Sequence, residues 1–264
     1  MPAHDLALLT DAARAAGEVA LRYWKNAPKF WEKGDQGPVT EADLAVNDLL
    51  QSRLLAARPG YGWLSEESPD GPARLDCDRA FIIDPIDGTR AFLAGEAHFS
   101  HSLAVAQAGR VVAAVVYLPA LDRLYTAVKD GPALVDGAPA LCSATARSEK
   151  ANILTSKANL SADHWQGAVP AFRRSFRASL AYRLCLVAEG SFDAMLTFRD
   201  TWEWDIAAGS LIAERAGARV SDRHGAALRF NRATAQTQGV LVAPPALHAD
   251  LIARVRQRDA TLPH

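Results

Sequence analysis

Two aspartates three residues apart, Asp84 and Asp87, are the side chains of this sequence best placed to do chemistry. Asp84 follows the apolar run 81–83, so we expect its carboxylate at the end of a buried strand. Asp87 and Gly88 predict a tight turn, and Thr89 is placed to cap a short helix that follows. Carboxylates that converge across such a turn suit a hard cation, and a helix start offers N–H groups to a phosphate. The pattern therefore favours metal-assisted phosphate chemistry.

Three other acidic residues lie at the ends of apolar elements. Glu66 follows an apolar strand, Asp43 precedes the apolar stripe of a helix, and Asp205 begins another helix. Each has a structural alternative: Asp43 forms a capping box with Thr40, Asp205 is an N-cap, and Glu66 with Glu67 is an exposed loop pair. A cluster of like charges at the ends of apolar elements is costly unless cations bind there. Together these residues predict a metal site.

The elements that must position these side chains fall into two groups. Apolar residues at three- and four-residue steps predict helices over residues 6–24 and after Thr40. Strands are expected at 61–64 and 80–83, followed by an antiparallel meander over 103–106, 111–117 and 124–128. Strands and helices then alternate, with strands at 152–156, 192–196, near 219 and at 239–243, and helices at 180–189, 206–217 and from 245. The pattern predicts two halves, 1–145 and 146–264.

Composition excludes several classes of protein. The 264 residues contain 29 Lys+Arg and 30 Asp+Glu, so no basic stripe is available as a dedicated nucleic-acid surface. No apolar run approaches the ~20 residues that a membrane helix needs, and no charged-then-apolar leader opens the chain. Cys77, Cys142 and Cys185 have neither a disulfide pattern nor a zinc pattern. We expect a cytoplasmic enzyme with reduced cysteines.

The run Asp84-Pro-Ile-Asp-Gly-Thr89 has Thr40-Glu-Ala-Asp43 and Glu66-Glu67 upstream and Trp204-Asp205-Ile-Ala-Ala-Gly209 downstream. This combination resembles the inositol monophosphatase family, the lithium-sensitive, magnesium-dependent phosphatases of small phosphates, over residues 5–255. The resemblance implies a layered αβαβα sandwich. Its α+β half, 1–145, would carry most metal ligands, and its α/β half, 146–264, would supply Asp205 and substrate contacts. It also implies two or three Mg²⁺ ions, a small phosphorylated substrate and a homodimer.

The resemblance also assigns roles to single residues. Glu66, Asp84 and the backbone carbonyl of Ile86 would hold the first Mg²⁺, and Asp84, Asp87 and Asp205 the second. Asp43 would assist a third ion and, with Thr89, would position and deprotonate the attacking water; Glu66 would join them in catalysis. The substrate phosphate would meet Asp87, Asp205 and the N–H groups of Gly88 and Thr89. No histidine has a role in this set, and we interpret His98 and His101 as surface or core-edge residues.

The motifs define the reaction more closely than the substrate. Seven residues before Asp205, where the inositol enzymes have a glutamate that contacts inositol, this chain has Phe198. An apolar ring cannot hydrogen-bond a polyol. Lys157 and Arg183 instead resemble basic residues of the 3′(2′),5′-bisphosphate nucleotidase branch and could bind a second phosphate. The structural alternative places Arg183 on a solvated helix face and Lys157 in a loop.

Two substrate classes thus stay open: an inositol monophosphate, and a nucleotide such as adenosine 3′,5′-bisphosphate, whose base could stack on Phe198, Trp202 or Trp204 if these are not core residues. Two further hypotheses are a sugar bisphosphatase, for which the chain is short, and a non-catalytic regulatory binding protein on the same fold. The complete set of acidic ligands argues for an enzyme, a phosphoric monoester hydrolase.

Overall fold

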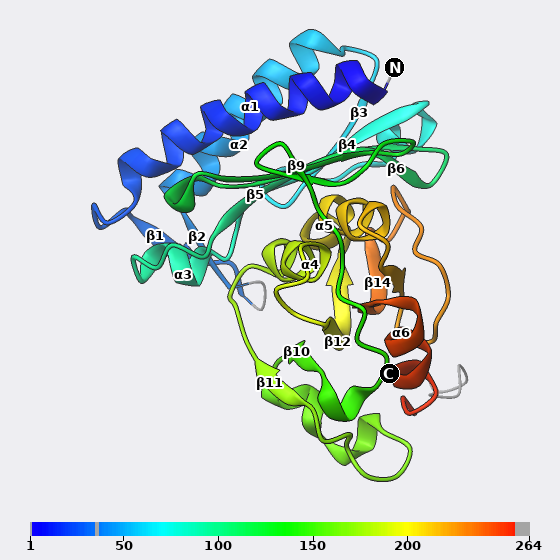
Figure 1. The fold of residues 1–264 in the computed structure, drawn as a ribbon. Helices are drawn as coiled ribbons and strands as arrows, with labels where there is room; N and C mark the ends of the chain where they lie inside the picture. Colours follow the sequence, from blue (N-terminus) through cyan, green and yellow to red (C-terminus); the bar gives the residue numbers. More distant parts are fainter. Residues whose placement is uncertain (1, 35–36, 257–264) are drawn as a thin grey trace.

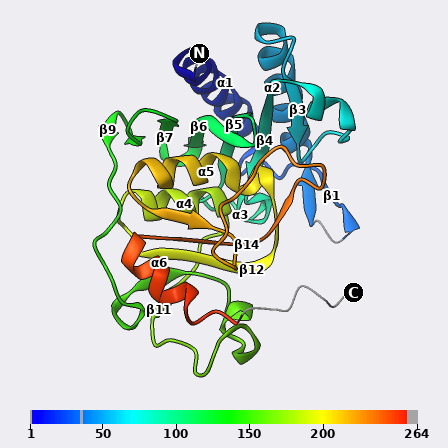
Figure 2. The same ribbon diagram turned by 90° about the vertical axis from the view of Figure 1, so that its right-hand side faces the viewer.

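The computed structural model describes residues 2–34 and 37–256, which stack in five alternating layers of helix and sheet (Figure 1). Helices α1 (Pro2–Tyr23) and α2 (Glu41–Ala57) cover one face of a seven-stranded sheet. Helices α4 (Leu180–Ala188) and α5 (Glu203–Arg215) fill the space between this sheet and a five-stranded one, as Figure 2 shows from the side. Helix α6 (Pro245–Ile252) covers the outer face of the second sheet. The predicted αβαβα sandwich is confirmed.

The larger sheet has the strand order β3-β4-β5-β6-β7-β8-β9. Only β3 and β4 run parallel; the remaining neighbours are antiparallel, as the sequence predicted for this half. Its strands are β3 (Gly62–Ser65), β4 (Arg79–Asp87), β5 (Ser100–Gln107), β6 (Arg110–Leu118), β7 (Arg123–Val128), β8 (Leu134–Val135) and β9 (Ala138–Pro139). The short helix α3 (Thr89–Leu93) follows β4, and a hairpin of β1 (Phe30–Glu32) and β2 (Pro38–Thr40) precedes α2.

The smaller sheet has the order β11-β10-β12-β14-β13 and is mixed. Its strands are β10 (Asn152–Leu154), β11 (Arg173–Ser175), β12 (Ala194–Trp202), β13 (Arg219–Ser221) and β14 (Gln236–Ala243). Short 3₁₀ turns also connect these elements, among them η2 (Pro72–Asp76), η3 (Pro119–Leu121), η4 (Ser148–Lys150), η5 (Lys157–Leu160) and η6 (Ala162–His164). The predicted division between residues 145 and 146 lies in the segment that joins the two sheets, and it stays a prediction.

Helix burial follows from position in the layers. All nine residues of α4 are buried because a sheet, a helix and a second sheet surround it. Helix α1 buries one stripe of small side chains and lies close to the larger sheet. At Gly17 an added Cβ would stand 2.7 Å from the ring of Tyr117, so this close approach requires glycine.

A β-bulge interrupts the pairing of β4 with β5 at the acidic motif. Asp84 pairs with Ser102 and Asp87 pairs with Ser100, so two residues of β4 stand opposite the single residue His101. A bulge bends its strand and re-aims side chains. Because of this one, β4 continues through the motif to residue 87 instead of ending at 83, and both aspartates belong to the strand.

A second bulge interrupts β12, in the smaller sheet. The pairing with β14 shifts between Thr197 and Asp200, so Phe198 and Arg199 stand opposite Gly239. Gly239 has φ +69°, and a Cβ there would lie 2.5 Å from the carbonyl oxygen of Thr197. The close backbone approach at this bulge therefore requires glycine.

Two predicted helix starts are wrong. Helix α5 begins at Glu203 after the extended residue Trp202, so Asp205 lies within the first helical turn and is not an N-cap. Thr89 is the first residue of α3, and the N-cap position belongs to Gly88 in the left-handed conformation (φ 98°). Both aspartate and threonine side chains are thereby free of the capping role and available to the site. Within the described residues, no helix is both long and apolar enough to cross a membrane.

Candidate functional site

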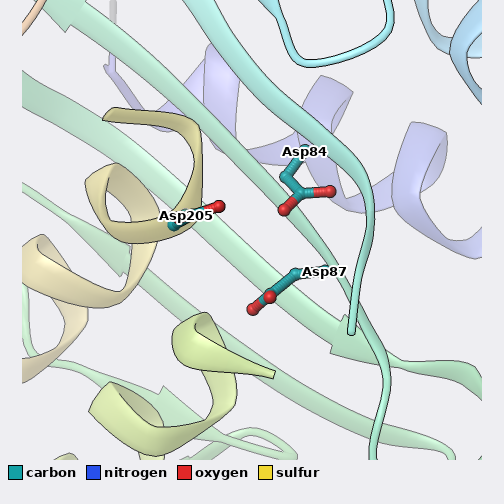
Figure 3. A group of neighbouring side chains, drawn as sticks. All are labelled: Asp84, Asp87 and Asp205. Carbon is teal, nitrogen blue, oxygen red and sulfur yellow. The ribbon is translucent and has the colours of Figure 1, made fainter. Parts of the chain in front are cut away.

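The three carboxylates of Asp84, Asp87 and Asp205 converge between the two sheets. One oxygen of each lies within 4.8 Å of one oxygen of the other two, and Figure 3 shows the three side chains beside one another. Asp84 and Asp87 come from the bulge of β4, whereas Asp205 comes from the first turn of α5. The site exists only because the two halves of the chain meet here.

One carboxylate oxygen of this cluster is buried without a hydrogen-bond partner in the described part of the chain. Asp84 is 1% exposed, and its Oδ1 has no hydrogen-bond partner among residues 2–34 and 37–256. Burial raises the pKa of Asp84 well above its usual value, and the charges of Glu66 and Asp87 raise it further. Burial and the charge of Asp87 also raise the pKa of Asp205 to about 7. A buried set of oxygen donors with an unpartnered carboxylate oxygen fits a hard divalent cation.

Asp87 is held by the start of helix α4. Its Oδ2 accepts hydrogen bonds from Ser179 Oγ at 2.7 Å and from the Ala181 N–H at 2.6 Å. Burial raises the pKa of Asp87, while these hydrogen bonds lower it. Ser179 also caps α4 by accepting the Tyr182 N–H at 2.9 Å. The start of helix α4 thus orients Asp87, a predicted metal ligand.

Glu66 lies directly after β3 and lines the same cleft as the three aspartates. Burial and the charges of Asp205 and Glu67 raise its pKa well above the usual value. Glu67 turns the other way and forms an ion pair with Lys33, a residue that sequence reasoning missed. The adjacent glutamates are therefore not an exposed pair, because Glu66 faces the cleft and Glu67 is neutralised beside it.

Asp43 has both roles that the sequence left open. Its Oδ2 accepts from the Thr40 N–H at 2.8 Å and completes a capping box at the start of α2. Its Oδ1 accepts from Thr89 Oγ1 at 3.2 Å, and this hydroxyl also lies 3.1 Å from the Ile86 carbonyl oxygen. Burial raises the pKa of Asp43 to about 6. The structure thus brings Asp43, Ile86 and Thr89 together beside the aspartate cluster.

Gly88 connects the bulge to α3 where the backbone is crowded. Its φ is +98°, and a Cβ would lie 3.2 Å from the Ser179 nitrogen and 3.3 Å from the His98 carbonyl oxygen. A side chain at this position would push α4 away from Asp87. Glycine here allows the two halves to approach each other at the site.

The carboxylates line a cleft of about 520 Å³, and three arginines, Arg90, Arg183 and Arg199, line the same cleft. The side chain of Arg183 is 8% exposed, so the alternative of a solvated helix face is wrong for it. Its guanidinium donates to the carbonyl oxygens of Arg177 and Ala178 and lies 4.2 Å from the centre of the Phe176 ring. Burial lowers its pKa to about 10, and it stays charged at neutral pH.

Arg199 also lines the cleft, and sequence reasoning missed it. The bulge in β12 turns Arg199 into the cleft and its neighbour Phe198 into the core, where the Phe198 ring packs 5.4 Å from Trp165. A basic residue next to the position of the family's glutamate was visible in the sequence. Its direction was not, because a shift of one residue reverses which side chain faces the cleft.

Other predicted contacts lie outside the cleft. Lys157 is exposed and is absent from the residues that line it, whereas its neighbour Ser156 is present. Trp202 and Trp204 stack on each other at 4.6 Å and pack in the core between the sheets, as the core alternative predicted. The predicted set thus comes together except for Lys157.

The two histidines after the motif differ from each other. His98 is half-buried and stacks on Tyr182 at 5.8 Å. His101 is fully buried, and its Nδ1–H donates to the carbonyl oxygen of Pro85 inside the bulge. Burial lowers the pKa of His101 to about 4, so the ring is neutral. The interpretation as a surface or core-edge residue is wrong for His101.

Comparisons with known proteins identify the family of this chain. The model of the inositol monophosphatase family matches residues 2–260. The chain belongs to this family. It is 36% identical over 203 residues to the inositol-1-monophosphatase of Rhizobium meliloti, covering 73% of this chain and 75% of that protein. It is 32% identical over 232 residues to the 3′(2′),5′-bisphosphate nucleotidase CysQ of Salmonella typhimurium, covering 83% and 90%.

A solved structure supports the same conclusion for the fold. The extragenic suppressor protein suhB of Bartonella henselae superimposes with a TM-score of 0.82 at 26% identity, over 95% of this chain and 97% of that one. As a member of the inositol monophosphatase family, the chain is a phosphatase that hydrolyses phosphomonoesters. The regulatory, non-catalytic alternative is not needed.

Proposed function

We propose that this family member is a Mg²⁺-dependent phosphatase that hydrolyses a small phosphate monoester by direct attack of water. The observation that carries the proposal is the convergence of Asp84, Asp87 and Asp205 with an unpartnered buried oxygen on Asp84. Glu66 and the Ile86 carbonyl complete an oxygen-only ligand set beside them. Bound Mg²⁺ would neutralise the phosphate charge and lower the pKa of a bound water.

Thr89 and Asp43 can take up the proton that the attacking water loses. When Thr89 Oγ1 donates its hydrogen to Asp43 Oδ1 instead of to the Ile86 carbonyl oxygen, its lone pairs can accept a hydrogen bond from water. A proton leaving that water can pass through the hydroxyl to Asp43. Asp43 lies within hydrogen-bond distance of Thr89 Oγ1, the geometry that this transfer requires. The N–H groups of Gly88 and Thr89 are the proposed donors to the phosphate.

For the substrate, we propose a phosphate monoester with a second anionic group, of which adenosine 3′,5′-bisphosphate is the test compound. Arg183 and Arg199 support this choice, because guanidinium groups in the same cleft as the carboxylates favour a ligand with a second anionic group. The second candidate is an inositol monophosphate, supported by the 36% identity to the Rhizobium meliloti inositol-1-monophosphatase. Phe198 argues against it, since the ring is turned away from the cleft.

The test is phosphate release from both compounds in parallel, with Mg²⁺ and with excess chelator. We expect turnover only with Mg²⁺ and a higher kcat/KM for the bisphosphate. Preference for the inositol ester would select the second candidate, and turnover that persists in chelator would refute the metal-dependent reaction. Inhibition by lithium, a homodimer and a cytoplasmic location are further proposals; light scattering of the purified protein tests the dimer.

A further inference from the structure

Strand β5 has three consecutive polar residues in a position where apolar ones are expected. Ser100, His101 and Ser102 are all 0% exposed, whereas the strand continues with Leu103, Ala104 and further apolar residues of both neighbouring cores. Burying three polar side chains in a row is unfavourable unless each has a hydrogen-bond partner. Two of the partners, Pro85 and Trp204, belong to segments that carry predicted metal ligands. The third, Ser179, donates to the predicted ligand Asp87.

Ser102 holds the backbone next to Asp205. Its Oγ donates to the carbonyl oxygen of Trp204 at 2.9 Å, and Trp204 directly precedes Asp205 in the first turn of α5. This bond joins the larger sheet to the helix that supplies the third carboxylate. A hydrogen bond of this kind constrains the position of α5 relative to β4 more closely than apolar packing, which is not directional.

Ser100 holds Asp87 through Ser179. The Oγ atoms of Ser100 and Ser179 lie 3.0 Å apart, and either could be the donor on geometry alone. The hydrogen of Ser179 goes to Asp87 Oδ2, because a carboxylate oxygen only accepts. Ser100 is therefore the donor to Ser179, and the chain of bonds runs from Ser100 through Ser179 to Asp87.

His101 holds the bulge between the two aspartates of β4. It is the single residue opposite Pro85 and Ile86, and its Nδ1–H donates to the Pro85 carbonyl oxygen. Because side chains alternate along a strand, His101 approaches from the α1/α2 side, and the two serines approach from the α4/α5 side. Strand β5 thus contacts the metal-ligand segments from both of its faces.

We propose that Ser100, His101 and Ser102 are positioning residues that hold Asp87, the Asp84–Asp87 bulge and Asp205 in the arrangement that binds the metal. The inference rests on the proposed function, because it concerns the same metal centre. It adds three residues that contact neither metal nor substrate and act through Ser179, Pro85 and Trp204. Loss of such supporting hydrogen bonds typically weakens metal affinity by about 10–100-fold.

The test measures Mn²⁺ binding to the substrate-free protein by calorimetry, together with the melting temperature in chelator. We expect Ser102→Ala and His101→Leu each to weaken Mn²⁺ binding about 10-fold or more. His101→Asn keeps a donor near the position of Nδ1 and is expected to restore affinity to within about threefold of wild type, since only the hydrogen bond has to be kept. A purely structural role would not separate leucine from asparagine in this way.

Ser210→Ala is the matched control. Ser210 is also a buried serine, lies on α5, and its Oγ has no hydrogen-bond partner in the described part of the chain. Its loss should leave Mn²⁺ affinity unchanged. If His101→Leu does not fold, the Mn²⁺ affinity of Ser102→Ala, which removes a single hydroxyl, still tests the inference.

Two results would overturn the inference, and they are distinguishable. If wild type binds Mn²⁺ and the Ser102 and His101 variants bind it equally well while melting at lower temperature, the three residues are structural only and the proposed function stands. If wild type binds no divalent cation, the proposed function fails and this inference fails with it.

Discussion

The bulge in β4 and the bulge in β12 face the same cleft from different sheets, and they present opposite charges to it. In β4, two residues opposite His101 separate Asp84 from Asp87 and give the carboxylate wall. In β12, two residues opposite Gly239 direct Arg199 into the cleft and Phe198 into the core. The first bulge builds the proposed metal site and the second the proposed substrate site. A substitution in the β4 bulge should therefore affect the reaction, and one in the β12 bulge should affect the choice of substrate.

The largest effect is expected from the carboxylates of the first bulge. Asp87→Asn removes a charge from the metal-ligand set and should lower kcat by about a thousandfold, since a lost ligand charge costs roughly 4 kcal/mol of transition-state stabilisation. Circular dichroism should show an unchanged fold, because an asparagine oxygen can still accept from Ser179 and the Ala181 N–H. Activity close to wild type would remove Asp87 from the site.

The second bulge should affect substrate binding and leave the metal in place. Arg199→Gln removes a guanidinium from the cleft, and the lost charged hydrogen bond, about 1.5–3 kcal/mol, should lower kcat/KM for the bisphosphate about 10–100-fold. Glycerol 2-phosphate, with no second anionic group, should be affected much less. Lys157→Met tests the sequence prediction directly: a loss equal to that of Arg199→Gln would restore Lys157 as the substrate residue.

Changing the shape of the second bulge should cost stability. In Gly239→Ala the new Cβ would lie 2.5 Å from the Thr197 carbonyl oxygen, at a position where φ is +69°. We expect the free energy of unfolding to fall by about 1–3 kcal/mol. Urea unfolding measures this loss. Mn²⁺ affinity should stay that of wild type, because the first bulge is untouched. A large loss of metal binding would show that the two bulges are not independent.

The smallest effect is a dependence of stability on pH in the metal-free protein. Burial raises the pKa of Asp205 to about 7 and those of Glu66 and Asp84 well above their usual values. The folded protein therefore keeps protons that the unfolded chain has released, so the free energy of unfolding should fall as pH rises from 6.5 to 8. The buried histidines His101 and His248 have pKa values lowered to about 4, so they change the free energy of unfolding mainly below pH 6.5.

Melting temperatures in chelator at pH 6.5 and pH 8 measure this dependence. A loss of 1 kcal/mol corresponds to about 2–4 °C for a chain of this size. Asp205→Asn is the comparison variant, because it removes one of the carboxyl groups whose pKa is raised. It should reduce the change in melting temperature between the two pH values. An equal change in wild type and variant would show that Asp205 is ionised across the whole range.

The sequence predicted the first bulge's chemistry but not the second's, and the reason is physical. Asp84, Asp87 and Gly88 lie within five residues, so their local order already implies convergence. Arg199 faces the cleft only because of its register against Gly239, forty residues later, and register is a property of the folded sheet. The roles of Ser100, His101 and Ser102 could not be predicted for a similar reason, because the role of a buried polar side chain depends on its hydrogen-bond partner in the folded protein.

Phosphate release by the wild-type protein and by Asp205→Asn, each with Mg²⁺ and with excess chelator, tests the metal site most directly. Asp205 joins the carboxylate cluster from the opposite half of the chain, so it reports whether the assembled site does the chemistry. We predict Mg²⁺-dependent release by wild type, none in chelator, and a loss of about a thousandfold in the folded variant. Release that is undiminished in chelator, or a fully active Asp205→Asn, would contradict the account.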